Sequence, residues 1–165
     1  MSLTPDSLYI ALYIRSDPPV RDDFHWALYL HRPREGTGTG IKYHIRNAGT
    51  PGWIAAHAPE TSIMSTFLLV GLLRIADLSA TSSRSVVDRL IRAYDDRINE
   101  MDVTCRTWLF KALELLNEEK FLREGEEIDL GALEREVMDW GNEVAKDATK
   151  NVQPRPIGAS KVCGF

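Results

Sequence analysis

The sequence predicts an α+β domain in which a small antiparallel sheet packs against about three helices. Up to about residue 80 the apolar runs are short, rich in β-branched and aromatic residues, and separated by Pro and Gly. Beyond that point apolar residues recur at helical spacing. Strands followed by helices are typical of the α+β class. The chain has 165 residues, 44% of them hydrophobic, which suits one domain with its own core. We assign residues 1–150 to that domain and residues 151–165 to a C-terminal tail.

The predicted strands occupy the first half of the chain. Residues 8–14 are apolar on both faces, which is typical of a central strand. Residues 24–30 alternate, so that Trp26 and Leu28 lie on one face and His25 on the other. A Gly- and Thr-rich loop at 34–40 leads into a strand at 41–46, which predicts an antiparallel hairpin. Thr50-Pro51-Gly52 predicts another turn, and residues 64–75 predict a further strand, with a short helix as the alternative.

Three helices are expected in the second half. The Ser- and Thr-rich stretch 79–85 contains candidate N-caps for the first helix, whose apolar side extends as far as Tyr94 and Ile98. A second helix is predicted to begin near Val103 or Thr104, and Asp129 is the expected cap of a third. Residues 151–165 contain two prolines, two glycines and no periodicity, so this tail either docks on the domain or stays loose.

Composition limits the classes of function. The net charge is −4, which disfavours nucleic acid as the main partner. The sequence contains no apolar run of membrane-spanning length, and its first residues do not resemble a secretion signal. Two cysteines are too few for a disulfide framework, which favours a reducing, cytoplasmic location. The cysteines and histidines do not show metal-ligand spacing, so we expect no metal and no cofactor. The oligomeric state stays open.

Cys105 is the first candidate for chemistry. It lies at the predicted start of the second helix, where free backbone N–H groups and the helix dipole favour a thiolate. A thiolate there is a nucleophile, and a neighbouring N–H can stabilise an oxyanion. The alternative is a small buried residue without a chemical role.

His25 and His44 are the second and third candidates. A register in which His25 faces His44, and Leu28 faces Ile41, would bring both imidazoles onto one face of the hairpin. A base oriented by a second polar group would then be available to a nucleophile. The alternative is two unrelated strand histidines. We expect His31 and His57 to be surface residues.

The motifs resemble a known family of enzymes. The strand His25-Trp26-Ala27-Leu28-Tyr29, the following Tyr43-His44-Ile45 and Cys105 at a helix start resemble the permuted papain-like fold of lecithin–retinol acyltransferase-type and NlpC-type proteins. That resemblance implies that His25 is the general base, His44 its orienting residue and Cys105 the nucleophile.

A second resemblance covers residues 8–120. A family of uncharacterised small fungal proteins is similar in three segments: Leu-Tyr-Ile-Ala-Leu-Tyr at 8–13, His-Trp-Ala-Leu at 25–28 and Cys-Arg-Thr-Trp-Leu at 105–109. Thr104 departs from the acyltransferase pattern, in which Asn often precedes the cysteine.

Three functions follow as hypotheses. The first is a cysteine-dependent hydrolase or acyltransferase acting on an ester, thioester or amide of a small or lipid-like molecule. The second is a biosynthetic cyclase or isomerase that uses the histidines as acid and base without a covalent intermediate. The third is an inactive binding module. The expected partner is a small-molecule or acyl substrate. The side chains expected to line its pocket are Trp26, Tyr43, Trp53, Phe67 and Trp108.

Overall fold

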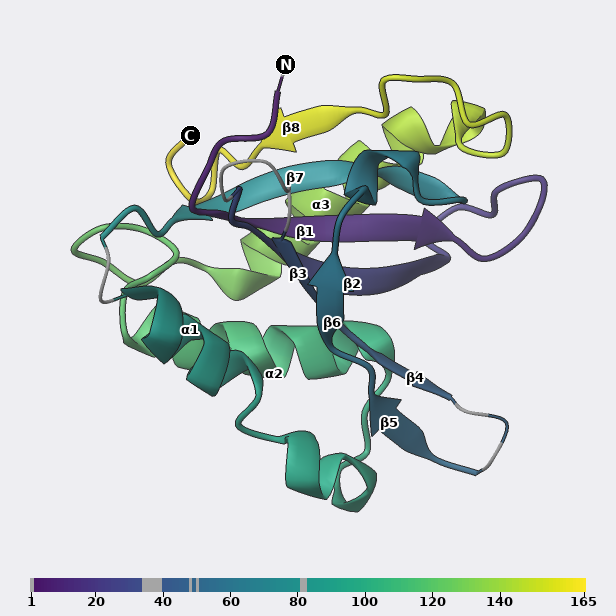
Figure 1. The fold of residues 1–165 in the computed structure, drawn as a ribbon. Helices are drawn as coiled ribbons and strands as arrows, with labels where there is room; N and C mark the ends of the chain where they lie inside the picture. Colours follow the sequence, from purple (N-terminus) through teal and green to yellow (C-terminus); the bar gives the residue numbers. More distant parts are fainter. Residues whose placement is uncertain (1, 34–39, 48, 50, 81–82) are drawn as a thin grey trace.

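The computed structural model describes residues 2–33, 40–47, 49, 51–80 and 83–165. It is an α+β fold with a six-stranded sheet in the order β6-β3-β2-β1-β7-β8 and three helices (Figure 1). The strands of this sheet are β1 (Ser7–Ile14), β2 (Phe24–His31), β3 (Gly40–Tyr43), β6 (Ala58–Glu60), β7 (Leu69–Asp77) and β8 (Ile157–Ala159).

Strand β1 is at the centre of the sheet, as its apolar sequence predicts. It pairs antiparallel with β2 on one side and with β7 on the other, and all eight of its residues are buried. A strand buried on both faces needs cover on both sides of the sheet. The sheet therefore has a hydrophobic core on each face, and successive residues of each strand contribute to the two cores in turn.

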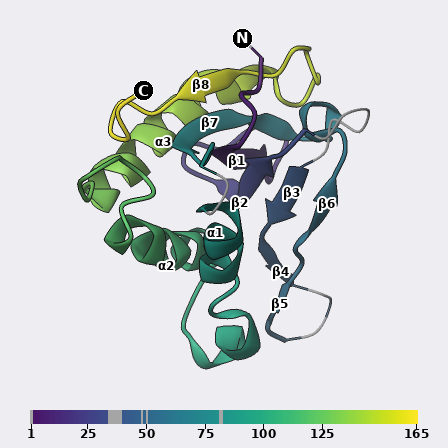
Figure 2. The ribbon, with the colours of Figure 1, turned by 60° about the vertical axis from the view of Figure 1, so that its left-hand side comes forward.

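The three helices cover one face of the sheet (Figures 1 and 2). They are α1 (Ser83–Ile91), α2 (Cys105–Glu118) and α3 (Leu130–Val144). The second and third begin where predicted, capped by Thr104 and Asp129. Helix α1 is shorter than predicted, because it ends at Ile91. Tyr94 immediately precedes the 3₁₀ helix η2 (Asp95–Glu100), and Ile98 lies within η2. The candidate caps at 81–82 lie outside the described residues.

A smaller cluster covers the opposite face. It contains Tyr9, Tyr13 and Ala27 and extends to Ile63 of the 3₁₀ helix η1 (Ile63–Ser65). The strand predicted at 64–75 corresponds to β7. It begins later than predicted, at Leu69, because η1 occupies the first of the predicted strand residues. The hairpin prediction is confirmed by the antiparallel pairing of β2 with β3, although residues 34–39 of its loop lie outside the described part.

A two-stranded arm extends from the sheet at its lower right in Figure 1. It consists of β4 (Ile45–Asn47) and β5 (Trp53–Ala55), paired antiparallel. The predicted strand 41–46 is thus split between β3 and β4 at His44. Of the predicted turn at 50–52, Thr50 lies outside the described residues.

The sheet is mixed, which corrects the prediction of an antiparallel sheet. Strand β8 comes from the tail and pairs in parallel with β7, so the tail docks. Buried Arg155 holds it there, donating hydrogen bonds to the carbonyl oxygens of Leu69 and Val70 in β7. The same guanidinium also donates to the carbonyls of Val144, Asp147 and Val152.

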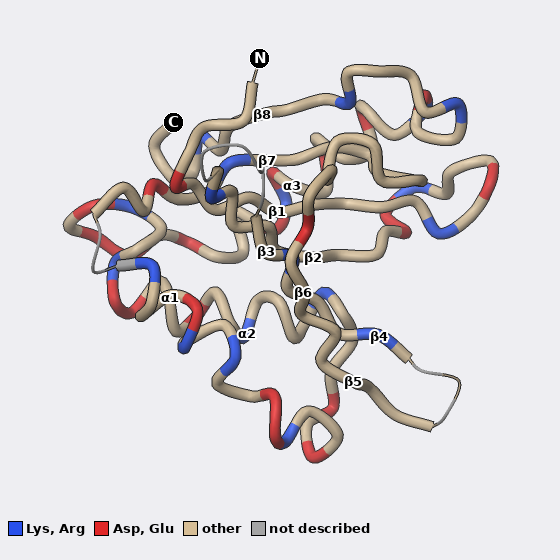
Figure 3. Tube along the Cα trace, viewed as in Figure 1, with Lys and Arg blue, Asp and Glu red and all other residues tan. Residues whose placement is uncertain are grey.

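No helix in the described part of the chain is long and apolar enough to cross a membrane. Figure 3 shows acidic and basic residues interspersed along the trace.

Replacing Arg155 with Met is expected to lower the free energy of unfolding by about 3 kcal/mol, because the carbonyl groups would stay buried without their donor. Urea unfolding measures the change. Arg123→Met is the control, since it removes a surface ion pair of a half-exposed arginine with Glu126, which is worth about 1 kcal/mol or less. Equal losses in both variants would contradict the role of Arg155.

Candidate functional site

His25 and His44 meet at one end of the sheet. His25 is the second residue of β2, and His44 lies between β3 and β4. Nε2 of His25 is 3.0 Å from Nδ1 of His44, and the rings are nearly perpendicular at 76°. The observed register pairs Leu28 with Tyr43, two residues away from the register considered above. His44 is therefore level with Ala27 and diagonal to His25, and a shift of two keeps both imidazoles on one face.

Both imidazoles are neutral at pH 7. Burial lowers the pKa of His25 from 6.5 to about 4, and the positive charges of Lys42 and Arg15 add to the effect. Burial, Lys42 and His25 lower the pKa of His44 to about 3. One hydrogen atom therefore lies between Nε2 of His25 and Nδ1 of His44. The two outward nitrogens, Nδ1 of His25 and Nε2 of His44, then differ, one carrying a hydrogen and the other a lone pair. The pair presents one acid and one base.

His57 supports His44 from behind. The backbone N–H of His44 donates to Nδ1 of His57 at 3.1 Å, and Nε2–H of His57 donates to Asp95 Oδ1 at 2.9 Å. These two bonds place the ring hydrogen of His57 on Nε2. The side chain is only 2% exposed and stacks on Trp108 of α2. The expectation that His57 is a surface residue is wrong, because a contact 38 residues away along the chain buries it.

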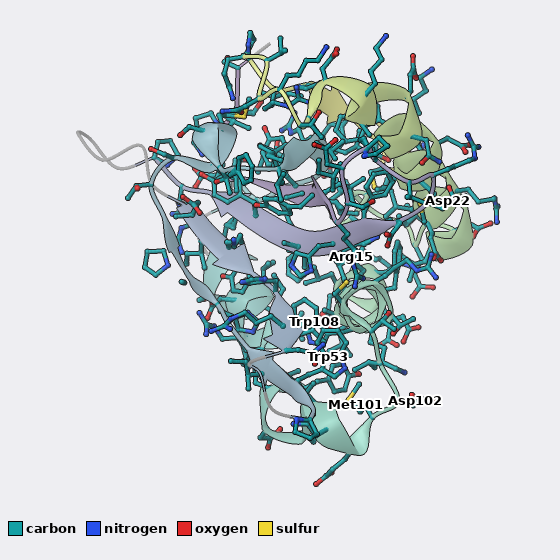
Figure 4. The ribbon with its side chains drawn as sticks, turned by 90° about the vertical axis from the view of Figure 1, so that its right-hand side faces the viewer. Arg15, Asp22, Trp53, Met101, Asp102 and Trp108 are labelled. Atoms are coloured by element: carbon teal, nitrogen blue, oxygen red, sulfur yellow. The ribbon has the colours of Figure 1, made fainter. Side chains whose placement is uncertain are left out.

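The 3₁₀ helix η2 holds the arm beside this site. Besides Asp95, it contributes Asn99, whose Oδ1 accepts from Trp53 N–H at 2.7 Å and whose Nδ2 donates to Trp53 O at 2.9 Å. In Figure 4, Trp108 and Trp53 lie between Arg15 above and Met101 and Asp102 below. The arm, η2 and the start of α2 therefore meet at one end of the molecule.

Cys105 is the first residue of α2, as predicted. Thr104 Oγ1 accepts from Thr107 N–H, and Thr107 Oγ1 accepts from Thr104 N–H, which together form a capping box. The thiol is free and the residue is 3% exposed. In the described residues no hydrogen bond joins its Sγ to His25 or His44. Cys105 belongs to the buried cluster on the helix side, whereas the ring of His25 contacts Tyr13 of the opposite cluster.

The structure therefore brings two of the three candidate residues into contact. His25 and His44 share a hydrogen bond, and Cys105 stands at the helix start without a bond to either. The sequence reasoning missed His57 and Asp95. No local signal marks them, since His57 lies in an Ala-rich segment and Asp95 in a charged turn.

The predicted pocket aromatics differ in accessibility. Trp26 packs on Phe110 of α2, and Trp108 stacks on His57, both fully within the core. Tyr43 is also buried, and its hydroxyl donates to Asp88 of α1 at 2.5 Å. Trp53 is half-buried, and Phe67 is 69% exposed. Trp53 therefore retains accessible surface, unlike the other three predicted substrate-binding residues, Trp26, Tyr43 and Trp108.

The described residues do not contain a group of three or more His, Cys, Asp or Glu side chains arranged to hold a metal ion. The histidine pair can exchange protons through its two outward nitrogens, whereas the thiol of Cys105 is buried.

Comparison with known proteins identifies a family. Residues 6–155 match a family of unknown function, DUF6914. The chain belongs to this family. The match covers the whole sheet except β8 and includes His25, His44, His57 and Cys105. Neither the curated proteins nor the solved structures contain a match.

Acid should destabilise the fold through the histidine pair. An unfolded histidine has a pKa near 6.5, so between about pH 6.5 and 3 the unfolded chain binds more protons than the folded chain at both positions. The free energy of unfolding should fall as the pH falls through this window. Urea unfolding at pH 7.0, 5.5 and 4.5 checks it, with the double variant His25→Gln/His44→Gln expected to show a smaller decrease. Parallel decreases in both proteins would exclude the pair as the cause.

Replacing His57 with Phe tests the support of His44. Phe keeps the stacking on Trp108, but it leaves the N–H of His44 without its acceptor, which should cost about 2 kcal/mol of unfolding free energy. His31→Phe is the matched control, because it removes a hydrogen bond between the His31 ring and Tyr29 Oη outside this network. In NMR spectra the His44 imidazole resonances should move in the first variant and stay unchanged in the second.

Proposed function

We propose that this protein is a cysteine-dependent hydrolase or acyltransferase with a permuted papain-like arrangement of its site. Its substrate would be an ester, thioester or amide of a small or lipid-like molecule. The observation that carries the proposal is the hydrogen bond between His25 and His44. A nucleophilic mechanism requires a base and a partner that orients it, and here β2 supplies one histidine and the junction between β3 and β4 supplies the other.

The neutral state of the pair supports this role. An imidazole that is unprotonated at pH 7 can accept a proton, and burial together with Lys42 and Arg15 keeps His25 in that state. His57 and Asp95 fix the backbone at His44, so the second ring is held in place from outside the pair. They act here as positioning residues.

The position of Cys105 supports the other half of the mechanism. The capping box leaves the backbone N–H groups of Cys105 and Arg106 without intrahelical acceptors, as at every helix start. Those groups can hold the oxygen that becomes negative when a carbonyl is attacked. Strand β2 packs against α2 through Trp26 and Phe110, so the thiol and the base belong to adjoining elements.

The proposed reaction has two steps. The lone-pair nitrogen of the histidine pair takes the thiol proton, and Sγ of Cys105 bonds to the carbonyl carbon while the leaving alcohol, thiol or amine departs with that proton. The pair then takes a proton from water or from an acceptor amine or alcohol, whose oxygen or nitrogen bonds to the acyl carbon. The bond between that carbon and Sγ breaks, and the pair returns the proton to Sγ of Cys105. Sγ must reach an outward nitrogen of the pair during this reaction. Both cysteines are free thiols, which fits the reducing, cytoplasmic location that we propose.

A second function is favoured by a different observation. In the described residues Sγ of Cys105 has no hydrogen bond to either ring, and the pair by itself supplies one acid and one base. We therefore also propose acid–base catalysis without a covalent intermediate, as in a cyclase or isomerase, with Cys105 as a buried residue.

The pH dependence of iodoacetamide alkylation in a Cys163→Ser background tests the first function. Cys163 suits this design, because it is buried and burial raises its pKa to about 11, so its removal deletes an unreactive thiol. A coupled Cys105 should react rapidly below pH 7, and His25→Ala should slow it by at least about tenfold.

His31→Ala is the matched control and should leave the alkylation rate of Cys105 unchanged. A thiol that reacts only near pH 8.5, with or without His25, would contradict the covalent mechanism. Turnover of activated esters gives a further test of the first function: Cys105→Ala should abolish it, and ester turnover that survives in this variant would contradict a covalent cysteine mechanism.

A further inference from the structure

His44 lies at a junction where strand pairing does not fix its direction. Strand β3 ends at Tyr43 and β4 begins at Ile45, so His44 lies between two ladders. The segment that follows β5 bonds its backbone on both sides. The N–H of His44 donates to Nδ1 of His57, and its carbonyl oxygen accepts from Ala56 N–H at 2.9 Å. The direction of the imidazole therefore depends on the groups that hold Tyr43 and His57.

The rings of Tyr43 and Trp108 both pack against the ring of His57. The centroids of Tyr43 and His57 are 5.4 Å apart with an interplanar angle of 59°, and Trp108 stacks on His57 at 5.7 Å and 26°. All three side chains are buried, and Asp95 accepts the ring hydrogen of His57. Because protein interiors are close-packed, His57 can move only if one of these neighbours moves as well.

Asp88 of α1 holds the hydroxyl end of Tyr43. Tyr43 Oη donates to Asp88 Oδ1 at 2.5 Å, and Arg92 Nε, one turn further along the chain, donates to both carboxylate oxygens at 3.1 Å. Burial and the bond to Asp88 raise the pKa of the Tyr43 hydroxyl, so this hydroxyl remains a donor at neutral pH. Hydrogen bonds to an ionised carboxylate are stronger than neutral ones. Helix α1 is therefore bonded to the last residue of β3.

Tyr43 and His44 connect the two sides of the sheet. Tyr43 belongs to the buried cluster on the helix side. The ring of His44 bonds that of His25, which contacts Tyr13 of the opposite cluster. The two residues are consecutive, so a displacement of Tyr43 on the helix side moves the backbone that carries the His44 ring.

We propose that Asp88 is a positioning residue for the histidine pair. It acts through Tyr43, which fixes the chain next to His44 and packs against the ring of His57. Helix α1 is thereby coupled to the geometry of the pair, although it contributes no group to it. The effect of this coupling on a reaction rests on the proposed function, but its effect on the two rings does not.

Imidazole ¹⁵N NMR of the full chain at pH 7 tests the proposal. Each ring of a fixed pair holds one tautomer, so the two nitrogen resonances of His44 should be well separated. Tyr43→Phe and Asp88→Ala should each reduce this separation by about half, because a ring that is free to turn exchanges its tautomers. Asp88→Asn should keep most of the separation, since its amide oxygen still accepts from Tyr43 Oη.

The variants are chosen to keep the fold. The Asp88 side chain is 34% exposed on a helix, where alanine is well tolerated. Tyr9→Phe is the matched control, because it removes the hydroxyl of another buried tyrosine, which is bonded to Thr4 N–H outside this network. It should leave the His44 resonances unchanged.

Unchanged His44 resonances in Tyr43→Phe or Asp88→Ala would overturn the proposal. Equal changes in Tyr9→Phe would overturn it too, and so would a loss of separation in Asp88→Asn as large as in Asp88→Ala.

Alkylation of Cys105 in the Cys163→Ser background separates this proposal from the proposed function. If both hold, Asp88→Ala should slow the reaction below pH 7 by about threefold, because the base is less well oriented. Changed His44 resonances in a chain whose thiol reacts only near pH 8.5 would contradict the thiol mechanism alone. Alkylation that depends on His25, with His44 resonances unchanged in Asp88→Ala, would contradict the positioning role alone.

Discussion

The complete burial of β1 is the constraint on which the rest of the structure depends. A strand with all eight residues buried forces the chain to build a core on each face of the sheet. The three helices supply one core, and a smaller aromatic cluster with η1 supplies the other. At the free edge of β7 the tail adds a parallel strand, and Arg155 donates to carbonyl groups of β7, of α3 and of Val152 in the tail. The tail is therefore part of the domain.

The same two-sided sheet divides the chemistry. Alternation along β2 directs Trp26 toward α2 and His25 toward the other cluster. His44 lies where the chain leaves β3 and turns into the arm, so it connects the two sides. Its ring bonds His25, while its backbone bonds His57, which stacks on Trp108 of α2. The polar series from Asp95 through His57 and His44 to His25 crosses this end of the fold.

Burial then sets the protonation of the site. Burial, the contact between the two imidazoles and the nearby cations keep both rings neutral at pH 7, and neutral imidazoles can accept and donate protons at that pH. That state suits a thiol mechanism and an acid–base mechanism alike. The difference between the two lies in Cys105, which has the helix-start position of a nucleophile but is held within the core on the helix side.

The sequence by itself determined the elements and the faces. Alternation, helical periodicity and caps are local properties, so β1, β2 and the starts of α2 and α3 followed from them. The shared face of His25 and His44 was one of two alternatives, because it depends on the register between their strands. Only the tertiary structure decided the register, the parallel β8 and the burial of His57. Those features depend on contacts between distant segments. A register shift of two residues leaves every side chain on the same face of the sheet, so alternation alone cannot distinguish the two registers. His57 and Asp95 are 38 residues apart in the sequence, so no local pattern predicts their contact.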